Sequence, residues 1–132
     1  VYKRQFIFSS FLFLSSFISS EAKVYFINLN DGDQVQSPFL IQFGLSDMGI
    51  APAGMDRNNT GHHHLLINVN DIDLSKPIPS SSNHIHFGGG QTESLVELLP
   101  GSYSMQLVLG NMTHTPHDPP VVSQKINITV ID

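Results

Sequence analysis

The stretch at residues 60–69 (TGHHHLLINV) constrains the fold of this chain more than any other. Its second half is almost continuously apolar and must lie in a core, whereas its first half holds three histidines. Short apolar runs bounded by turn residues are typical of buried strands. Because side chains alternate along a strand, we expect His62 and His64 on one face. His63 then shares the apolar face, and we predict a core histidine whose hydrogen bonds are satisfied.

Short β-rich segments, separated by Gly, Pro, Asn and Asp, follow one another along the rest of the chain. Residues 102–109 alternate cleanly between apolar and polar side chains, which is the pattern of a half-buried strand. No window shows helical periodicity. The predicted strands are residues 24–29, 39–45, 62–69, 84–87, 92–99, 102–109 and 121–131. About seven short strands with turns between them predict an all-β, antiparallel sandwich.

The turn before residue 102 indicates an immunoglobulin-like sandwich. Residues 98–103 read LLPGSY, which resembles the corner of immunoglobulin-like and fibronectin-type domains. In that corner a tyrosine hydroxyl bonds back to the backbone a few residues upstream. We therefore expect Tyr103 to make such a bond. The alternative is an ordinary Pro-Gly turn followed by a core tyrosine.

The N-terminal residues are typical of a secretory signal. Residues 6–18 are apolar apart from serines, and about 13 residues are too few to span a bilayer, which takes roughly 20. We predict a signal peptide at residues 1–22, cleaved after Ala22, and a periplasmic or secreted domain at residues 23–132. An uncleaved anchor is the alternative. Residues 1–5 (VYKRQ) resemble a translated sequencing-adapter scar.

Composition excludes several partners and chemistries. The formal net charge of −5 argues against nucleic acid or anionic lipid as a partner. The chain has no cysteine, so it has no disulfide or thiol chemistry, and a metal site must use His, Met, Asp or Glu. No G-x-S-x-G motif is present, and residues 88–90 (GGG) precede neither a lysine nor a helix. We predict that the protein is not an enzyme and that these glycines form a hairpin turn or a close backbone approach.

All seven histidines fall into three short clusters. Imidazole is the commonest metal ligand, and pairs of histidines two residues apart on neighbouring strands predict a copper or zinc site. The predicted ligands are His62, His64, His84, His86, His114 and His117. The loop thioethers of Met55 and Met112 would favour copper(I). The carboxylates of Glu93 and Asp118 are predicted to orient ring nitrogens.

Two other interpretations stay open. The histidines can form a structural hydrogen-bond network, because the loops at residues 46–61 and 110–120 hold many backbone carbonyls. The same loops can bind a periplasmic protein or polymer, as end loops of immunoglobulin-like sandwiches often do. Both alternatives leave the predicted fold unchanged.

Residues 61–67 (GHHHLLI), 86–93 (HFGGGQTE) and 114–121 (HTPHDPPV) form a specific set of motifs. Together they resemble a small exported bacterial family that is catalogued as a domain of unknown function. The resemblance extends over residues 23–132 and implies a single periplasmic or secreted domain. It implies no activity, because none is established for the family.

Overall fold

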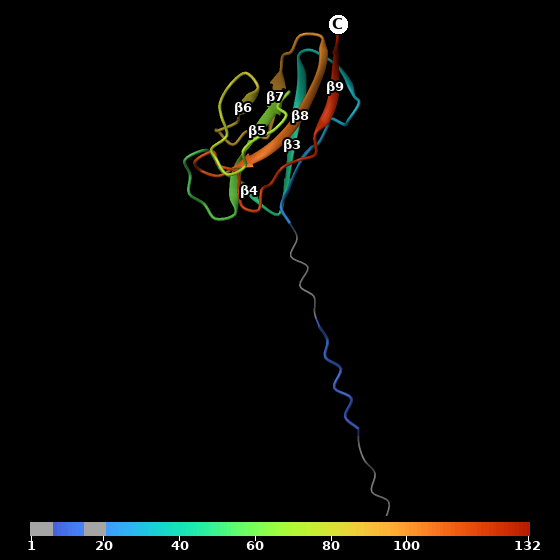
Figure 1. The fold of residues 1–132 in the computed structure, drawn as a ribbon, viewed down its shortest axis with the longest axis vertical. Helices are drawn as coiled ribbons and strands as arrows, with labels where there is room; N and C mark the ends of the chain where they lie inside the picture. Colours follow the sequence, from blue (N-terminus) through green and yellow to red (C-terminus); the bar gives the residue numbers. More distant parts are fainter. Residues whose placement is uncertain (1–6, 15–20) are drawn as a thin grey trace, which may run out of the picture.

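The computed structural model describes residues 7–14 and 21–132. Over these residues the chain forms nine strands and no helix, and the strands make two sheets (Figure 1). Side chains from both sheets meet in one hydrophobic core. The predicted all-β sandwich is therefore confirmed. The described residues contain no helix long and apolar enough to cross a membrane.

The first sheet has three strands in the order β1-β3-β7, and the second has six, in the order β2-β9-β8-β5-β4 with β6 also paired to β5. The strands are β1 (Lys23–Phe26), β2 (Gln34–Gln36), β3 (Phe39–Ser46), β4 (Gly49–Ile50), β5 (Thr60–Ile67), β6 (His84–His86), β7 (Glu93–Val96), β8 (Gly101–Gly110) and β9 (Ile126–Ile131). The sequence did not predict β2 and β4, which pair in parallel with β9 and β5. Each is too short to show an alternating pattern.

The C-terminal segment predicted as one strand at residues 121–131 is interrupted. Residues 126–131 form β9 and pair with the first half of β8. Val121 and Ser123 make separate backbone hydrogen bonds with Leu109 and Leu107 in the second half of β8. Pairing is broken between these two sections, so β8 is the long strand along which the whole C-terminal segment lies.

The core lies between the two sheets and follows the predicted alternation. In β3, Ile41 and Phe43 are buried, and in β8, Met105, Leu107 and Leu109 are buried. Full burial of an aliphatic or aromatic side chain of this size contributes roughly 1.5–3 kcal/mol. This apolar contact between the sheets, together with the antiparallel ladder that joins β5 to β8, holds these two strands in fixed positions.

The predicted tyrosine corner is confirmed. Tyr103 Oη donates a hydrogen bond of 2.7 Å to the carbonyl oxygen of Leu99, four residues upstream. The bond closes the turn between β7 and β8 in the way described for immunoglobulin-like domains.

Strand β5 is buried on both faces. On its inner face Leu65 and Ile67 join the core between the sheets. On its outer face Leu66 packs with Ile78 and Val108 in a second, smaller apolar cluster. The segment between β5 and β6, which carries Ile78, therefore covers part of the outer face of the second sheet.

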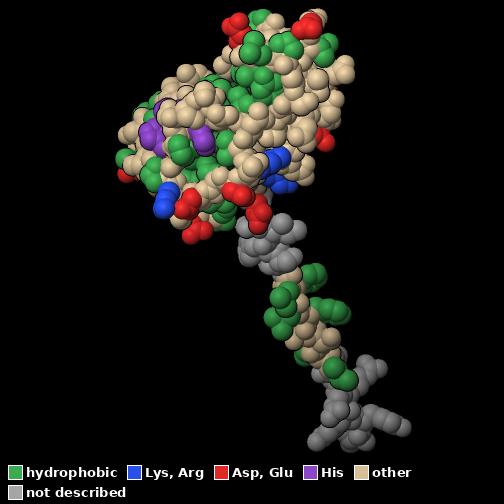
Figure 2. Space-filling model, turned by 45° about the horizontal axis from the view of Figure 1, so that its top comes forward, with side chains coloured by type: hydrophobic (Ala, Val, Ile, Leu, Met, Phe, Trp, Pro, Cys, Tyr) green, Lys and Arg blue, Asp and Glu red, His purple; other side chains and the backbone are tan. Residues whose placement is uncertain are grey.

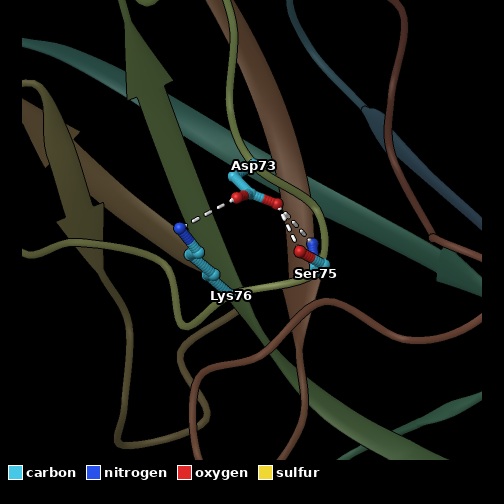
Figure 3. A network of polar contacts seen from close by, with 3 residues as sticks. All are labelled: Asp73, Ser75 and Lys76. Atoms are coloured by element: carbon cyan, nitrogen blue, oxygen red, sulfur yellow. Dashed lines mark hydrogen bonds and ion pairs between the residues drawn. The ribbon is translucent and has the colours of Figure 1, made fainter.

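A polar turn shapes that covering segment (Figure 3). The backbone nitrogen and the hydroxyl of Ser75 donate to Asp73 Oδ1 at 3.0 and 2.5 Å, and Lys76 Nζ lies 3.5 Å from Asp73 Oδ2. These hydrogen bonds from Ser75, together with Lys76, hold the pKa of Asp73 below its usual range. The turn is exposed, so its ion pair adds little to stability.

Most of the predicted signal segment falls outside the described residues. Residues 1–6, which include the predicted adapter scar, and residues 15–20 are not described. Within residues 7–14 the large apolar side chains are exposed.

Candidate metal centre

Four of the six predicted ligands meet on the outer face of the second sheet. His62 and His64 project from β5, and His86 on β6 pairs directly with His64. His114 reaches the same place from the loop after β8. The four side chains offer ring nitrogens that all lie within 4.8 Å of one another.

The four rings form one compact group. The centroids of the six ring pairs lie 4.5–5.9 Å apart. His62 Nε2 lies 3.1 Å from His114 Nδ1 and 3.1 Å from His86 Nε2. In a tetrahedral zinc site with Zn–N bonds of roughly 2.0–2.1 Å, neighbouring nitrogens are about 3.3 Å apart. The two measured contacts are therefore close to the spacing that a shared metal ion requires.

Hydrogen bonds alone do not account well for the two close contacts of His62 Nε2. A ring nitrogen of neutral imidazole carries either a hydrogen or a lone pair in the ring plane. His62 Nε2 therefore cannot be the hydrogen-bond donor in one of its two contacts and the acceptor in the other. In a hydrogen-bonded network it would have to share one lone pair or one hydrogen between His86 and His114. A cation placed among the three nitrogens would instead accept a separate lone pair from each.

Burial keeps the histidines of β5 neutral. Burial, followed by the neighbouring His86 and His114, lowers the pKa of His62 to about 4. Burial, followed by His62, His86 and His114, lowers the pKa of His64 to about 3. The pKa of His86 is also lowered, by burial and by His114. Since a metal binds the neutral imidazole, these rings are ready to act as ligands at neutral pH.

Several buried ring nitrogens have no hydrogen-bond partner within the described part of the chain. They include both nitrogens of His64 and Nδ1 of His62. A buried polar atom left unpaired costs about 1–3 kcal/mol. A metal ion bound to His64 would relieve part of this cost.

Two glycines make room for the histidine rings. A Cβ atom on Gly110 would lie 2.5 Å from His64 Cε1, and a Cβ atom on Gly88 would clash with the ring of His86. Any larger residue would displace these rings. Residues 87–90 form a turn closed by a bond from Gly90 N to Phe87 O, and at Gly88 a side chain, the ring of His86, makes the close approach. The role of Gly110 was not predicted from the sequence.

The site is open to solvent on one side. His62 and His64 are fully buried, whereas His86 is exposed and His114 is half-buried. Histidine side chains are visible at the surface in the space-filling view (Figure 2). A metal ion can therefore approach from the side of His86 and His114.

The other two predicted ligands lie outside this group of four. His84 is opposite Leu66 in the β5–β6 pair, and its Nδ1 is 2.8 Å from Ser81 Oγ. His117 packs against Gly61, where a Cβ atom would lie 2.8 Å from His117 Nε2. It lines a separate cavity of about 470 Å³ together with residues such as Met48.

His63 is a core residue, as predicted, but its hydrogen bonds are not satisfied. Its ring lies 5.1 Å from that of Phe43 on the inner face of β5. Neither ring nitrogen has a partner among the residues that the structure describes. Burial lowers the pKa of His63 to about 4. The prediction fails on this point because the ring lies beside Phe43 on the core face of β5, where no loop carbonyl of the described residues reaches its nitrogens.

The structure does not support the prediction that Glu93 and Asp118 orient the histidine rings. Glu93 begins β7 in the first sheet, where it pairs with Gln42, whereas the histidines lie on the outer face of the second. Over the described residues, no side-chain hydrogen bond joins Glu93 or Asp118 to a histidine. The thioether-bearing side chains of Met55 and Met112 are exposed, on loops joined by a 3.0 Å bond from Gly54 N to Met112 O.

The fold and the site define a β-sandwich domain with a cluster of four histidines on the outer face of one sheet. The chain belongs to the family described as Domain of unknown function (DUF4399), whose model matches residues 41–131. The matched region contains all four clustered histidines. No curated protein and no solved structure matches the chain.

Proposed function

We propose that this domain binds one transition-metal ion, copper or zinc, through His62, His64, His86 and His114. The observation that supports the proposal is the convergence of four imidazole nitrogens within 4.8 Å. Two of these rings are buried and held neutral. Imidazole is a good ligand for both copper and zinc, and the site has no thiolate that would favour a softer ion.

The proposed role is binding and not catalysis, in an exported protein. The apolar segment at residues 6–18 supports export. The group consists of four imidazoles and no carboxylate, so each of its ionisable side chains would serve as a ligand and none of the four would remain as a general acid or base. The thioethers of Met55 and Met112, exposed on two loops that a backbone hydrogen bond joins, would favour copper(I) as the ion.

Metal content and thermal stability test the proposal. The protein, freed of metal by a chelator, is titrated separately with copper(II) and zinc(II). We expect one equivalent of one metal to bind and the melting temperature to rise, because a ligand at 100 times its dissociation constant adds about 2.7 kcal/mol of stability. His62→Ala should abolish both effects. His84→Ala is the matched control, since it removes a histidine of the same β5–β6 pair from outside the cluster.

A structural role for the histidines is the second candidate, favoured by the two contacts of 3.1 Å made by His62 Nε2. In that case the loops would bind a protein or polymer and the histidines would only support them. This alternative predicts that His62→Ala destabilises the metal-free protein by about 1–3 kcal/mol and that neither copper nor zinc raises the melting temperature of the parent protein.

A further inference from the structure

The loop that carries His114 is built around one side chain, that of Asn111, and backbone bonds from Gly54 N to Met112 O and from Ile78 N to His114 O tie it to other loops. Asn111 Oδ1 accepts hydrogen bonds from Thr113 N at 2.9 Å, Thr113 Oγ1 at 2.9 Å and Thr115 N at 3.1 Å. The backbone of Asn111 adds two more bonds, from its own nitrogen to Thr115 O and from His114 N to its carbonyl oxygen. Residues 111–115 therefore form a closed turn built around one asparagine.

This turn holds His114 in an unfavourable backbone conformation. The φ angle of His114 is 65°, in the left-handed region that residues with a Cβ atom seldom adopt and that strains the backbone. Glycine would adopt it without strain. His114 supplies one of the four clustered imidazoles, and the bonds to Asn111 offset the strain of holding it in this conformation.

The strained conformation brings the main chain of His114 close to the site. The nitrogen that approaches His62 Nε2 is Nδ1, the ring nitrogen nearer to the backbone. His114 Cα also lies 3.4 Å from the position of a Cβ atom on Gly110. Because Nδ1 is close to the backbone, a small shift of the turn would move Nδ1 away from the other three nitrogens.

We infer that Asn111 is the positioning residue of the metal centre, which acts through His114 and makes it a ligand through Nδ1. The inference rests on the proposed metal binding. Asn111 does not itself belong to the group of four ligands. It fixes the turn so that the fourth imidazole is in place before the ion arrives.

The test uses zinc(II) alone as the probe and compares the parent protein with Asn111→Ala and Asn111→Asp. Loss of a group that orients a ligand typically weakens metal affinity by about 10–100-fold, and we expect this for Asn111→Ala. Asn111→Asp keeps an acceptor oxygen and should restore affinity to within a few-fold. Asn28→Ala is the control, because Asn28 also bonds to backbone atoms, at Leu40 and Gln42, in the other sheet.

Ring nitrogen NMR of the zinc-loaded proteins supplies a readout that a purely structural role would not change. In the parent protein His114 should carry zinc on Nδ1 and a hydrogen on Nε2, and in Asn111→Ala its signals should return to those of the metal-free ring. If Asn111→Ala does not fold, Thr113→Val removes only one of the three bonds and should still raise the dissociation constant a few-fold. Unchanged zinc affinity and ring signals in these variants would overturn the inference while the metal site stands. A parent protein that binds neither zinc nor copper would overturn both.

Discussion

His62 and His114 are 52 positions apart in the chain, yet His62 Nε2 and His114 Nδ1 are 3.1 Å apart. His62 Nε2 is equally close to His86 Nε2, so it is the nitrogen shared by both contacts of the cluster. The pairing of β5 with β6 and the turn after β8 bring the three residues together.

His62→Ala should therefore weaken metal binding more than His86→Ala does, because the buried His62 lies between two other ligands whereas His86 is exposed. For His62→Ala we expect a loss beyond the roughly 100-fold typical of an orienting residue. Isothermal titration with copper(II) or zinc(II) gives the comparison. His84→Ala should bind as the parent does, and an equal loss in all three variants would contradict the assigned site.

Gly110→Ala should damage the site without changing any ligand. The new methyl group would lie 2.5 Å from His64 Cε1 and must displace that ring. We expect weaker metal binding and a loss of about 1–3 kcal/mol in the free energy of unfolding, as for other overpacked positions. Gly49→Ala is the control, because its nearest neighbour would be at an ordinary 3.4 Å. Calorimetry and urea unfolding measure the two effects.

His63→Leu should stabilise the protein. The substitution removes two buried, unpaired ring nitrogens beside Phe43 and replaces them with apolar atoms of similar volume. We expect a gain of about 1 kcal/mol or more in the free energy of unfolding, with metal affinity unchanged because His63 faces the core. A marked loss of stability in urea unfolding would show that the ring has a partner inside the fold.

Acid should destabilise the metal-free protein between pH 6.5 and about 4. Burial lowers the pKa of His62 and His63 to about 4 and that of His64 to about 3, from 6.5 in the unfolded chain. In this window the unfolded state binds protons that the folded state does not. Each of the three residues should therefore remove about 1 kcal/mol of stability per unit of falling pH. Urea unfolding at several pH values measures the slope, which should be shallower in His63→Leu.

Tyr103→Phe should cost about 0.5–1.5 kcal/mol of stability by removing the 2.7 Å bond to Leu99. The corner belongs to the turn between β7 and β8, so metal affinity should stay at the level of the parent. Parallel measurements of melting temperature and metal binding separate the two effects. A change in affinity would show that the corner positions the site.

The sequence predicted the fold well because alternation along β3 and β8 reports directly which side chains face the core. It also placed His62, His64 and His86 together, since the spacing of two residues fixes their face. It could not separate His84 and His117 from the cluster, because register and loop geometry depend on contacts distant in the chain. The role of Asn111 was missed for a similar reason. An Asn-x-Thr turn is common, and the sequence does not show that this one positions His114 beside the other three histidines.

The alternation of β5 makes the domain sensitive to small changes in chain length. Its outward side chains include His62 and His64 and its inward ones His63 and Leu65, so deletion of one residue within the strand would exchange the two sets. Imidazoles would then enter the hydrophobic interior while aliphatic groups faced the ion. Insertions and deletions should accordingly be far better tolerated in the segments that flank β5 than anywhere between Thr60 and Ile67.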